Sequence, residues 1–346
     1  MSSWSDVTGF SAIKVTRHDG SQTGKIYANG RNQTEIIVYF EPVDVNGTPV
    51  KGLTSDDFLD PMALIDAVTG SKLNWHGDSD WFYTGEQNEF YFPVPESNKQ
   101  MVTNASDGTY HYTFYVSCSS DAQFRNMGVA VQFKLHDGTI ISTSDSSSSA
   151  SKTVINTVGQ ITYSKRDLTD IVQDDIPDGD NLYVSNYYVS LKENSDDRHI
   201  IKLTSDWHLG SEKNYGTEYY GAFYRYMNHP EYDTGGFRLG YLWGDLEKGQ
   251  RKVKIGVTGD DDGATMTVTV NERPYSVCWT RVYVDLDWGH STWAGTPNMT
   301  IYDQYGNSGH FWCQGNPDYT PQRGEYIIIH DGSALSDKVI MEDDSI

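Results

Sequence analysis

The chain has 346 residues, of which 37% are hydrophobic and 13% aromatic, so it is long enough for two or three domains and is not a disordered protein. Its 48 acidic and 26 basic residues give a net charge of −22, which repels nucleic-acid phosphates and anionic lipids. The 24 Tyr, 9 Trp and 32 Gly favour strands and tight turns over helical bundles.

The N-terminus has no basic segment followed by an apolar one, and no run of apolar residues is long enough to span a membrane. We therefore expect a soluble chain with no cleavable signal peptide and no transmembrane segment. It would be extracellular by a non-classical route, or part of a cytoplasmic inclusion or a virion. Cys118 continues an alternating apolar run and is expected in a core, whereas a bridge between Cys278 and Cys313 stays open.

The first 141 residues predict a β-sandwich. Thr34–Glu41 is a β-branched and aromatic run that predicts a buried strand, and Asn46-Gly47 after it predicts a two-residue type I′ turn. Gly108–Ser117 alternates cleanly, and Met127–Leu135 leads through Asp137-Gly138 into another hairpin. Short strands with turn residues between them are typical of sandwich folds.

This first module resembles bacterial Ig-like domains of the invasin and intimin type. The resemblance covers about a third of the module, chiefly its turn residues. The matching residues are Ala28, Asn29, Gly30, Thr34, Asp44, Asn46, Gly47, Pro49 and Val50. The resemblance implies a surface, adhesive or spacer module with no catalysis of its own.

Trp75 and Trp81 lie in a segment that departs from the Ig-like pattern and also contains His76, Asp78 and Asp80. Aromatic rings beside carboxylates can stack on sugar rings or form hot spots for protein contact. The alternative is that both tryptophans cap the sandwich core. Ser142–Lys152, which follows the module, reads STSDSSSSASK and predicts a solvated linker.

Residues 153–346 predict a second β-rich domain with at most one or two short helices, so the chain as a whole is expected to be mainly β. Thr153–Tyr163 predicts a strand pair around Gly159. Two acidic segments, Ser164–Asp180 and Gly259–Gly263, lack the regular spacing of a calcium loop and are interpreted as solvated loops, with calcium binding left open.

Arg198–Lys248 contains a strand followed by Asp206 and His208, a helix predicted at Glu218–Met227, and a second strand that leads into Asp245. This order resembles the start of calcineurin-like metallophosphoesterases. The resemblance implies that Asp206, His208 and Asp245 bind divalent metal, which would clamp a phosphate and supply hydroxide.

The remainder of that family pattern is incomplete. Glu272 follows Asn271 where the family has a histidine, and His290 and His310 stand alone where it has further metal ligands. The sequence after Asp245 alternates as strands, which leaves little room for the expected helices.

The last hundred residues are dense in aromatic rings and amides, set in Gly-rich loops. Such surfaces suit polar ligands, glycans above all, or contacts with other subunits, although many of these rings are expected in the core. The candidate ligand-binding rings here are Trp288, Trp293, Tyr302 and Trp312.

Three hypotheses follow. The first is a non-enzymatic adhesin-like or toxin-like binding protein, bacterial or phage, that presents aromatic loops to a host surface, a glycan or a partner protein. The second is a metal-dependent phosphoesterase using Asp206, His208 and Asp245, with His290 or His310 completing the site. The third is a structural protein that self-assembles through exposed edge strands. The first needs no cofactor, and none of the three involves nucleic acid.

Overall fold

The computed structural model describes residues 3–17, 20–77, 80–90, 108–119, 126–147, 150–176, 182–193, 197–207, 224–228, 236–254, 265–284, 291–316 and 327–334. The chain forms two compact units. The first comprises Met1–Ile161 and Gln304–Asn307, and the second Thr162–Asp303 and Ser308–Ile346. The fold is mainly β, as the sequence predicts, and its few helical turns are short. None of the described helices has the length and apolar character needed to cross a lipid bilayer.

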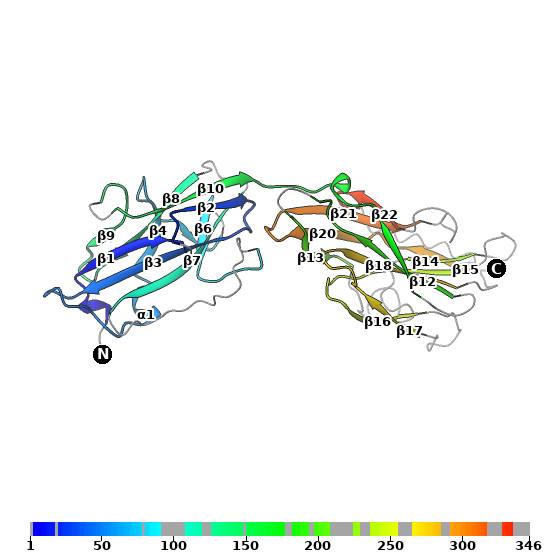
Figure 1. Cartoon of the computed structure of the whole chain (residues 1–346), viewed down its shortest axis with the longest axis horizontal. Helices are drawn as coiled ribbons and strands as arrows, with labels where there is room; N and C mark the ends of the chain where they lie inside the picture. Colours follow the sequence, from blue (N-terminus) through cyan, green and yellow to red (C-terminus); the bar gives the residue numbers. More distant parts are fainter. Residues whose placement is uncertain are drawn as a thin grey trace. The chain divides into compact units, whose positions relative to one another are not determined.

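The first unit is a sandwich of two sheets (Figure 1). One sheet has the strand order β1, β3, β7, β6, β5, with bounds Gly9–Thr16, Thr34–Val43, Tyr110–Cys118, Trp81–Thr84 and Asn74–Trp75. The other has the order β2, β10, β8, β4, with bounds Thr23–Ala28, Thr153–Gly159, Asn126–Lys134 and Met62–Asp66. β9 (Ile140–Ser142) pairs with β8, and the helical turns η1 and α1 span Trp4–Asp6 and Ser55–Phe58.

The core of this unit lies between the two sheets. Val38, Phe40 and Phe114 from one sheet and Val131 and Phe133 from the other belong to a single cluster of buried side chains. Alternation along each strand turns every second residue inward, which is why the aromatic-rich strands bury so much apolar area. Cys118 is fully buried in the same cluster, which confirms its expected core position.

Two predicted hairpins form, one with a different turn. β8 and β9 pair as expected around Gly138, which has φ of 87°. At Asn46-Gly47 only Gly47 takes a positive φ, 74°, while Asp44 accepts hydrogen bonds from the backbone N–H of Asn46 and Thr48. The turn is therefore a longer loop organised by the Asp44 side chain and not a two-residue type I′ turn.

The segment Ser142–Lys152 is not a linker between the units, so this prediction needs correction. Thr143 is fully buried and its hydroxyl accepts from Val131 N, while Ser151 Oγ accepts from Val15 N. β10 follows directly and pairs with β2 in parallel and with β8 in antiparallel register. Serine and threonine hydroxyls satisfy backbone groups inside the first unit, and the boundary falls after Ile161.

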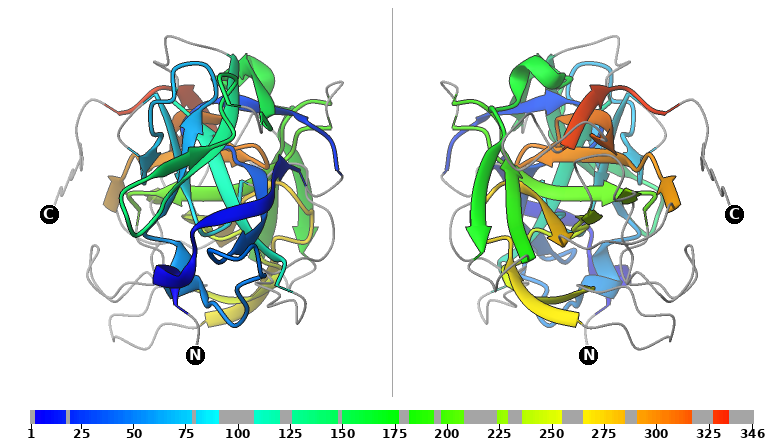
Figure 2. Two further views of the ribbon diagram at one scale, coloured as in Figure 1. Left: turned by 90° about the vertical axis from the view of Figure 1, so that its left-hand side faces the viewer. Right: turned by 90° about the vertical axis from the view of Figure 1, so that its right-hand side faces the viewer.

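The second unit contains a six-stranded sheet of order β11, β12, β18, β15, β14, β19. Its strands span Val172–Ile176, Leu182–Val189, Val277–Val284, Gly236–Leu242, Tyr224–Asn228 and Ser291–Ala294. β11 and β12 are the adjacent green strands in the right-hand view of Figure 2. A hairpin of β16 (Gly249–Lys254) and β17 (Thr265–Val270) packs on one face, since Val253, Val268 and Val270 share a core cluster with residues of β12, β15 and β18.

A four-stranded sheet of order β13, β20, β21, β22 completes the unit. Its strands span Ile200–Ser205, Asn298–Asp303, Ser308–Gly315 and Ile327–Asp331, and the turn η2 spans Lys165–Asp167. The prediction of a helix over Glu218–Met227 is wrong for those of its residues that the structure describes. Residues 224–227 belong to β14, which β15 and β19 pair on either side, and the rest lies outside the described residues.

Candidate functional site

The four-stranded sheet has one buried face and one partly exposed face, because buried and partly exposed residues alternate along β20 and β21. Met299, Ile301, Phe311 and Cys313 face the core. Two of the sequence-predicted rings, Tyr302 and Trp312, fall on the opposite face. We give the name aromatic strip to eight residues on this face of β20, β21 and β22: Asn298, Thr300, Tyr302, His310, Trp312, Gln314, Ile328 and His330.

Trp312 anchors one end of the aromatic strip. Its ring stacks on that of His330, its direct cross-strand partner, with ring centroids 3.9 Å apart and planes 11° from parallel. Burial, and next the charge of Lys165, lower the pKa of His330. The imidazole is therefore neutral at neutral pH, and the two uncharged rings each cover one face of the other.

Tyr302 lies at the other end, where the Lys202 ammonium sits 5.9 Å from its ring centroid. Between the two ends, Thr300 Oγ1 and His310 Nδ1 lie 2.9 Å apart in a hydrogen bond. Trp312 pairs with Asn298 and Tyr302 with Ser308, so the two aromatic positions are four residues apart along the strands. At the rise of an extended strand this is about 13 Å.

The other candidate rings have different positions. Trp81 is only 4% exposed and belongs to the first unit's core, so the expectation that it presents its ring to a ligand is wrong. Alternation along β6 turns Trp81 and Tyr83 inward together. Trp75 is 49% exposed and contacts Tyr83 and Phe114 edge to face. Trp288 lies outside the described residues, and for Trp293 only the backbone, in β19, is described.

The carboxylate of Asp206 accepts hydrogen bonds from Asn298, a residue of a neighbouring strand. Its Oδ1 accepts from Asn298 N at 2.8 Å and its Oδ2 from Asn298 Nδ2 at 2.6 Å. The Asp206 backbone N–H in turn donates to the carbonyl of Asn298. This carboxylate fastens the end of β13 to the start of β20. His208, its expected partner in metal binding, lies outside the described residues.

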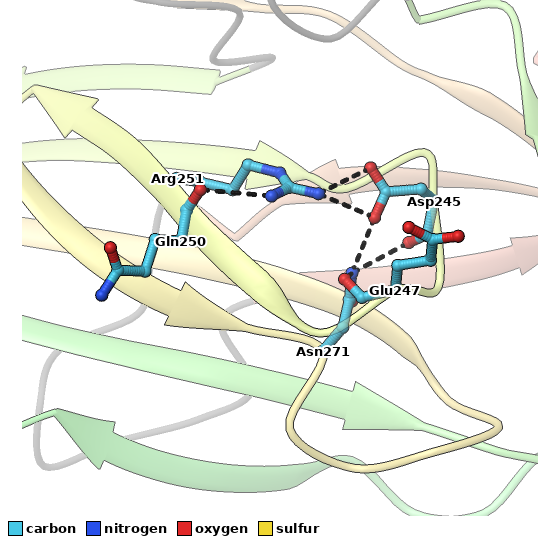
Figure 3. Close-up of polar contacts among 5 residues, drawn as sticks. All are labelled: Asp245, Glu247, Gln250, Arg251 and Asn271. Carbon is cyan, nitrogen blue, oxygen red and sulfur yellow. Dashed lines mark hydrogen bonds and ion pairs between the residues drawn. The ribbon is translucent and has the colours of Figure 1, made fainter.

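Asp245 has a comparable structural role (Figure 3). Arg251 Nη2 donates to both of its carboxylate oxygens, at 3.1 and 2.9 Å. Asn271 Nδ2 reaches the same carboxylate at 3.0 Å and also the carbonyls of Asp245 and Glu247. Together these contacts hold the loop between β15 and β16 against the end of β17.

No group of three or more His, Cys, Asp or Glu side chains is placed to hold a metal ion within the described ranges. Of the two further candidate ligands, His290 lies outside those ranges and His310 is bonded to Thr300 on the aromatic strip. All three cysteines are free and buried, so Cys278 and Cys313 do not form a bridge. Burial raises the pKa of each of these two thiols to about 12.

Sequence reasoning did not select His330. Its position in the strand sequence IIIHD carries a usable signal, because alternation places Ile327 and Ile329 inward and His330 on the opposite face. What the sequence lacks is the pairing of β22 with β21, which brings His330 against Trp312.

Comparisons with known proteins add little to this geometry. No protein-family model matches the sequence, and no curated protein matches it. A search of solved structures finds the C-terminal domain of AspA, an antigen I/II-family protein of Streptococcus pyogenes, at 7% identity and a TM-score of 0.22, covering 93% of this chain and 98% of that one. A likeness at this TM-score carries no argument about fold or function. The Ig-like and phosphoesterase resemblances therefore stay predictions.

Proposed function

We propose that this chain is a non-enzymatic binding protein whose aromatic strip binds a polar ring-containing ligand, a glycan in the first instance. The observation that carries the proposal is the placement of Tyr302, Trp312 and His330 on one partly exposed sheet face. A strand face with aromatic residues pointing toward solvent leaves apolar ring area in contact with water. A ligand with an apolar ring face would cover that area.

The polar groups of the strip suit such a ligand. His310, Thr300 and Gln314 supply imidazole, hydroxyl and amide groups beside the two aromatic ends. Hydroxyl and amide groups can both donate and accept, which matches the hydroxyls of a sugar. Because the Trp312 and Tyr302 positions are about 13 Å apart, a ligand with more than one ring could contact both.

The second hypothesis, a phosphoesterase, is less favoured. The carboxylates of Asp206 and Asp245 accept hydrogen bonds from Asn298, Arg251 and Asn271. A metal ion would compete with these donors for the carboxylate oxygens. No comparable observation supports the self-assembly hypothesis, and the acidic edge of β11 argues against pairing there.

A glycan array with the native chain and the variant Trp312→Ala tests the proposal. We expect bound glycans for the native chain and a weakening of roughly 2- to 12-fold in Kd for the variant, because one stacking contact contributes about 0.5–1.5 kcal/mol. Trp312→Phe keeps a ring and should bind more tightly than Trp312→Ala.

Tyr183→Ala serves as the control, since Tyr183 is 47% exposed on β12, in the same unit but off the strip. It removes an exposed ring without touching the proposed site and should leave Kd unchanged. A blank array, or equal weakening by Trp312→Ala and Tyr183→Ala, would refute glycan binding by the strip.

A further inference from the structure

The second unit contains a pocket of about 390 Å³ beside η2. Its wall includes three cationic residues, Lys165, Arg166 and Lys192, and one acidic residue, Asp170. The whole chain has 48 acidic and 26 basic residues, so this local excess of positive charge reverses the general pattern. Ligand sites commonly have volumes of roughly 300–1,000 Å³, and the pocket falls within that range.

Buried and partly exposed apolar side chains form part of the pocket lining. Leu168 is 6% exposed and Ile329 is 4% exposed, and the partly exposed Ile171 lines it beside them. Lys165, Arg166 and Lys192 are all exposed and therefore form the rim. A cationic rim over an aliphatic floor complements a molecule with a negative group at one end and an apolar body at the other.

Backbone contacts fix the walls of the pocket. Leu168 forms a β-bridge with Leu191, Lys192 N donates to Asp167 O at 2.9 Å, and Lys165 N donates to Asp331 Oδ1 at 2.5 Å. Lys192 Nζ donates to Arg166 O at 2.6 Å, which holds that ammonium at the rim. A site whose walls are already ordered loses little conformational entropy when a ligand binds.

Two further acids lie beside the rim and offset part of its charge. Asp167 and Asp331 lie close by but do not line the pocket, and both accept backbone N–H bonds, from Ser164 and Lys165. Burial alone would raise the pKa of Asp167, yet the bonds from Ser164 and the charges of Arg166 and Lys192 lower it overall. The field of the rim therefore favours a carboxylate in its charged form.

From these observations we propose that this pocket binds a small organic carboxylate with an apolar body. The carboxylate lies among Lys165, Arg166 and Lys192, and the body contacts Leu168, Ile171 and Ile329. The guanidinium of Arg166 offers paired donors that match a carboxylate, whereas the two ammonium groups act as point charges. None of the pocket residues belongs to the aromatic strip, although Lys165 lies near His330, and the proposal does not depend on glycan binding by the strip.

Ligand-observed NMR titration of the full chain tests the proposal with four probes. Benzoate carries both features, acetate only the carboxylate, benzyl alcohol only the apolar ring, and glucuronate a carboxylate on a polar ring. We expect benzoate to bind and the other three to bind about tenfold more weakly or not at all, since each lacks one of the two contacts. If acetate or glucuronate bound as tightly as benzoate, the proposed role of the apolar residues would be overturned.

The double variant Lys165→Gln/Arg166→Gln removes two rim charges at exposed positions and should weaken benzoate about tenfold. Lys25→Gln/Lys252→Gln removes two exposed charges elsewhere and gives the same net charge, so its Kd should equal that of the native chain. Far-UV circular dichroism confirms that both variants are folded. No benzoate binding to the native chain, or the same Kd for both double variants, would overturn the proposal.

Discussion

Tyr163 and Asp303 form a buried hydrogen bond between two side chains of the second unit. The Tyr163 hydroxyl donates to Asp303 Oδ2 at 2.6 Å, and Asp303 has no exposed surface. Burial, and next the negative charge of Asp303, raise the pKa of Tyr163 far above its usual range. Tyr163 therefore stays protonated and remains a donor at neutral pH.

Tyr163→Phe removes this donor and leaves a buried carboxylate with one partner fewer. We expect the free energy of unfolding to fall by about 1.5–3 kcal/mol, the range for hydrogen bonds to charged groups. Urea denaturation followed by circular dichroism measures the change. Tyr183→Phe, on an exposed ring, should stay within about 0.5 kcal/mol of the native value. Equal effects of the two substitutions would contradict a specific role for the Tyr163 bond.

Among single residues of the candidate site, the sequence predicted the position of some and not of others. Trp81 and Trp312 look alike in sequence, since each is an aromatic ring directly beside a phenylalanine, Phe82 or Phe311. Their difference arises from which strand face packs on the core, since Trp81 is 4% exposed and Trp312 lies on the outer face. Alternation predicts that neighbours face opposite ways, but not which of the two faces is covered.

At the scale of elements, most strands of the first module could be predicted. Thr34–Glu41 and Gly108–Ser117 correspond to β3 and β7, because β-branched and aromatic residues at a period of two determine a strand locally. The role of Ser142–Lys152 could not be predicted, because the composition of a segment does not show which other residues it contacts. Its buried position depends on hydroxyl bonds to Val15 and Val131, which are distant in sequence or belong to another strand.

β11 shows how an edge strand is protected. It ends the six-stranded sheet, and two of its residues are Asp174 and Asp175. Charged side chains on an edge oppose pairing with another chain, the more so when both copies are acidic. Arg273 Nε and Nη2 donate to Asp174 at 2.7 and 2.6 Å, which fixes the edge to the loop before β18.

This ion pair predicts a pH dependence. The hydrogen bond from Arg273 is the largest influence on the pKa of Asp174 and lowers it from its usual value. A lowered folded-state pKa stabilises the fold above the unfolded value of about 3.9, and the contribution disappears as pH falls through the folded value. Asp174→Asn should therefore be slightly less stable than the native chain at pH 7 and equally stable at strongly acidic pH.

Urea midpoints measured from pH 7 downwards check this expectation. Both partners are well exposed, so the difference at pH 7 is small. Arg273→Gln removes the other partner and should give the same convergence at low pH. A stability difference between native chain and Asp174→Asn that stays constant with pH would show that the pair is not its source.

At the scale of the whole molecule, the two-unit organisation could be predicted but its boundary could not. Both units are mainly β and both carry large cores, in agreement with the aromatic-rich composition. The observed boundary lies later in the chain than the predicted one, because β10 completes a sheet of the first unit. Pairing between strands that are distant in sequence cannot be predicted from local sequence patterns.

The net charge of −22 predicts a salt effect on the stability of the chain. Like charges repel more in the compact state than in the unfolded one, and raising salt from 0.01 to 1 M shortens the screening length from about 30 to about 3 Å. We expect Tm to rise, by about 2–4 °C for each 1 kcal/mol of repulsion removed. Calorimetry in NaCl and in KCl measures it, and a falling Tm in both salts would contradict the expectation.

The pairing of β10 with β2 also sets an order of events during synthesis. β2 begins at Thr23, whereas its partner begins at Thr153, so the earlier strand is made long before the later one exists. At translation rates of about 5–20 residues per second, β2 waits from several seconds to nearly half a minute. For that time one side of β2 has no β10 to pair with, and a chaperone or a neighbouring nascent chain that meets the protein then would find this side unpaired.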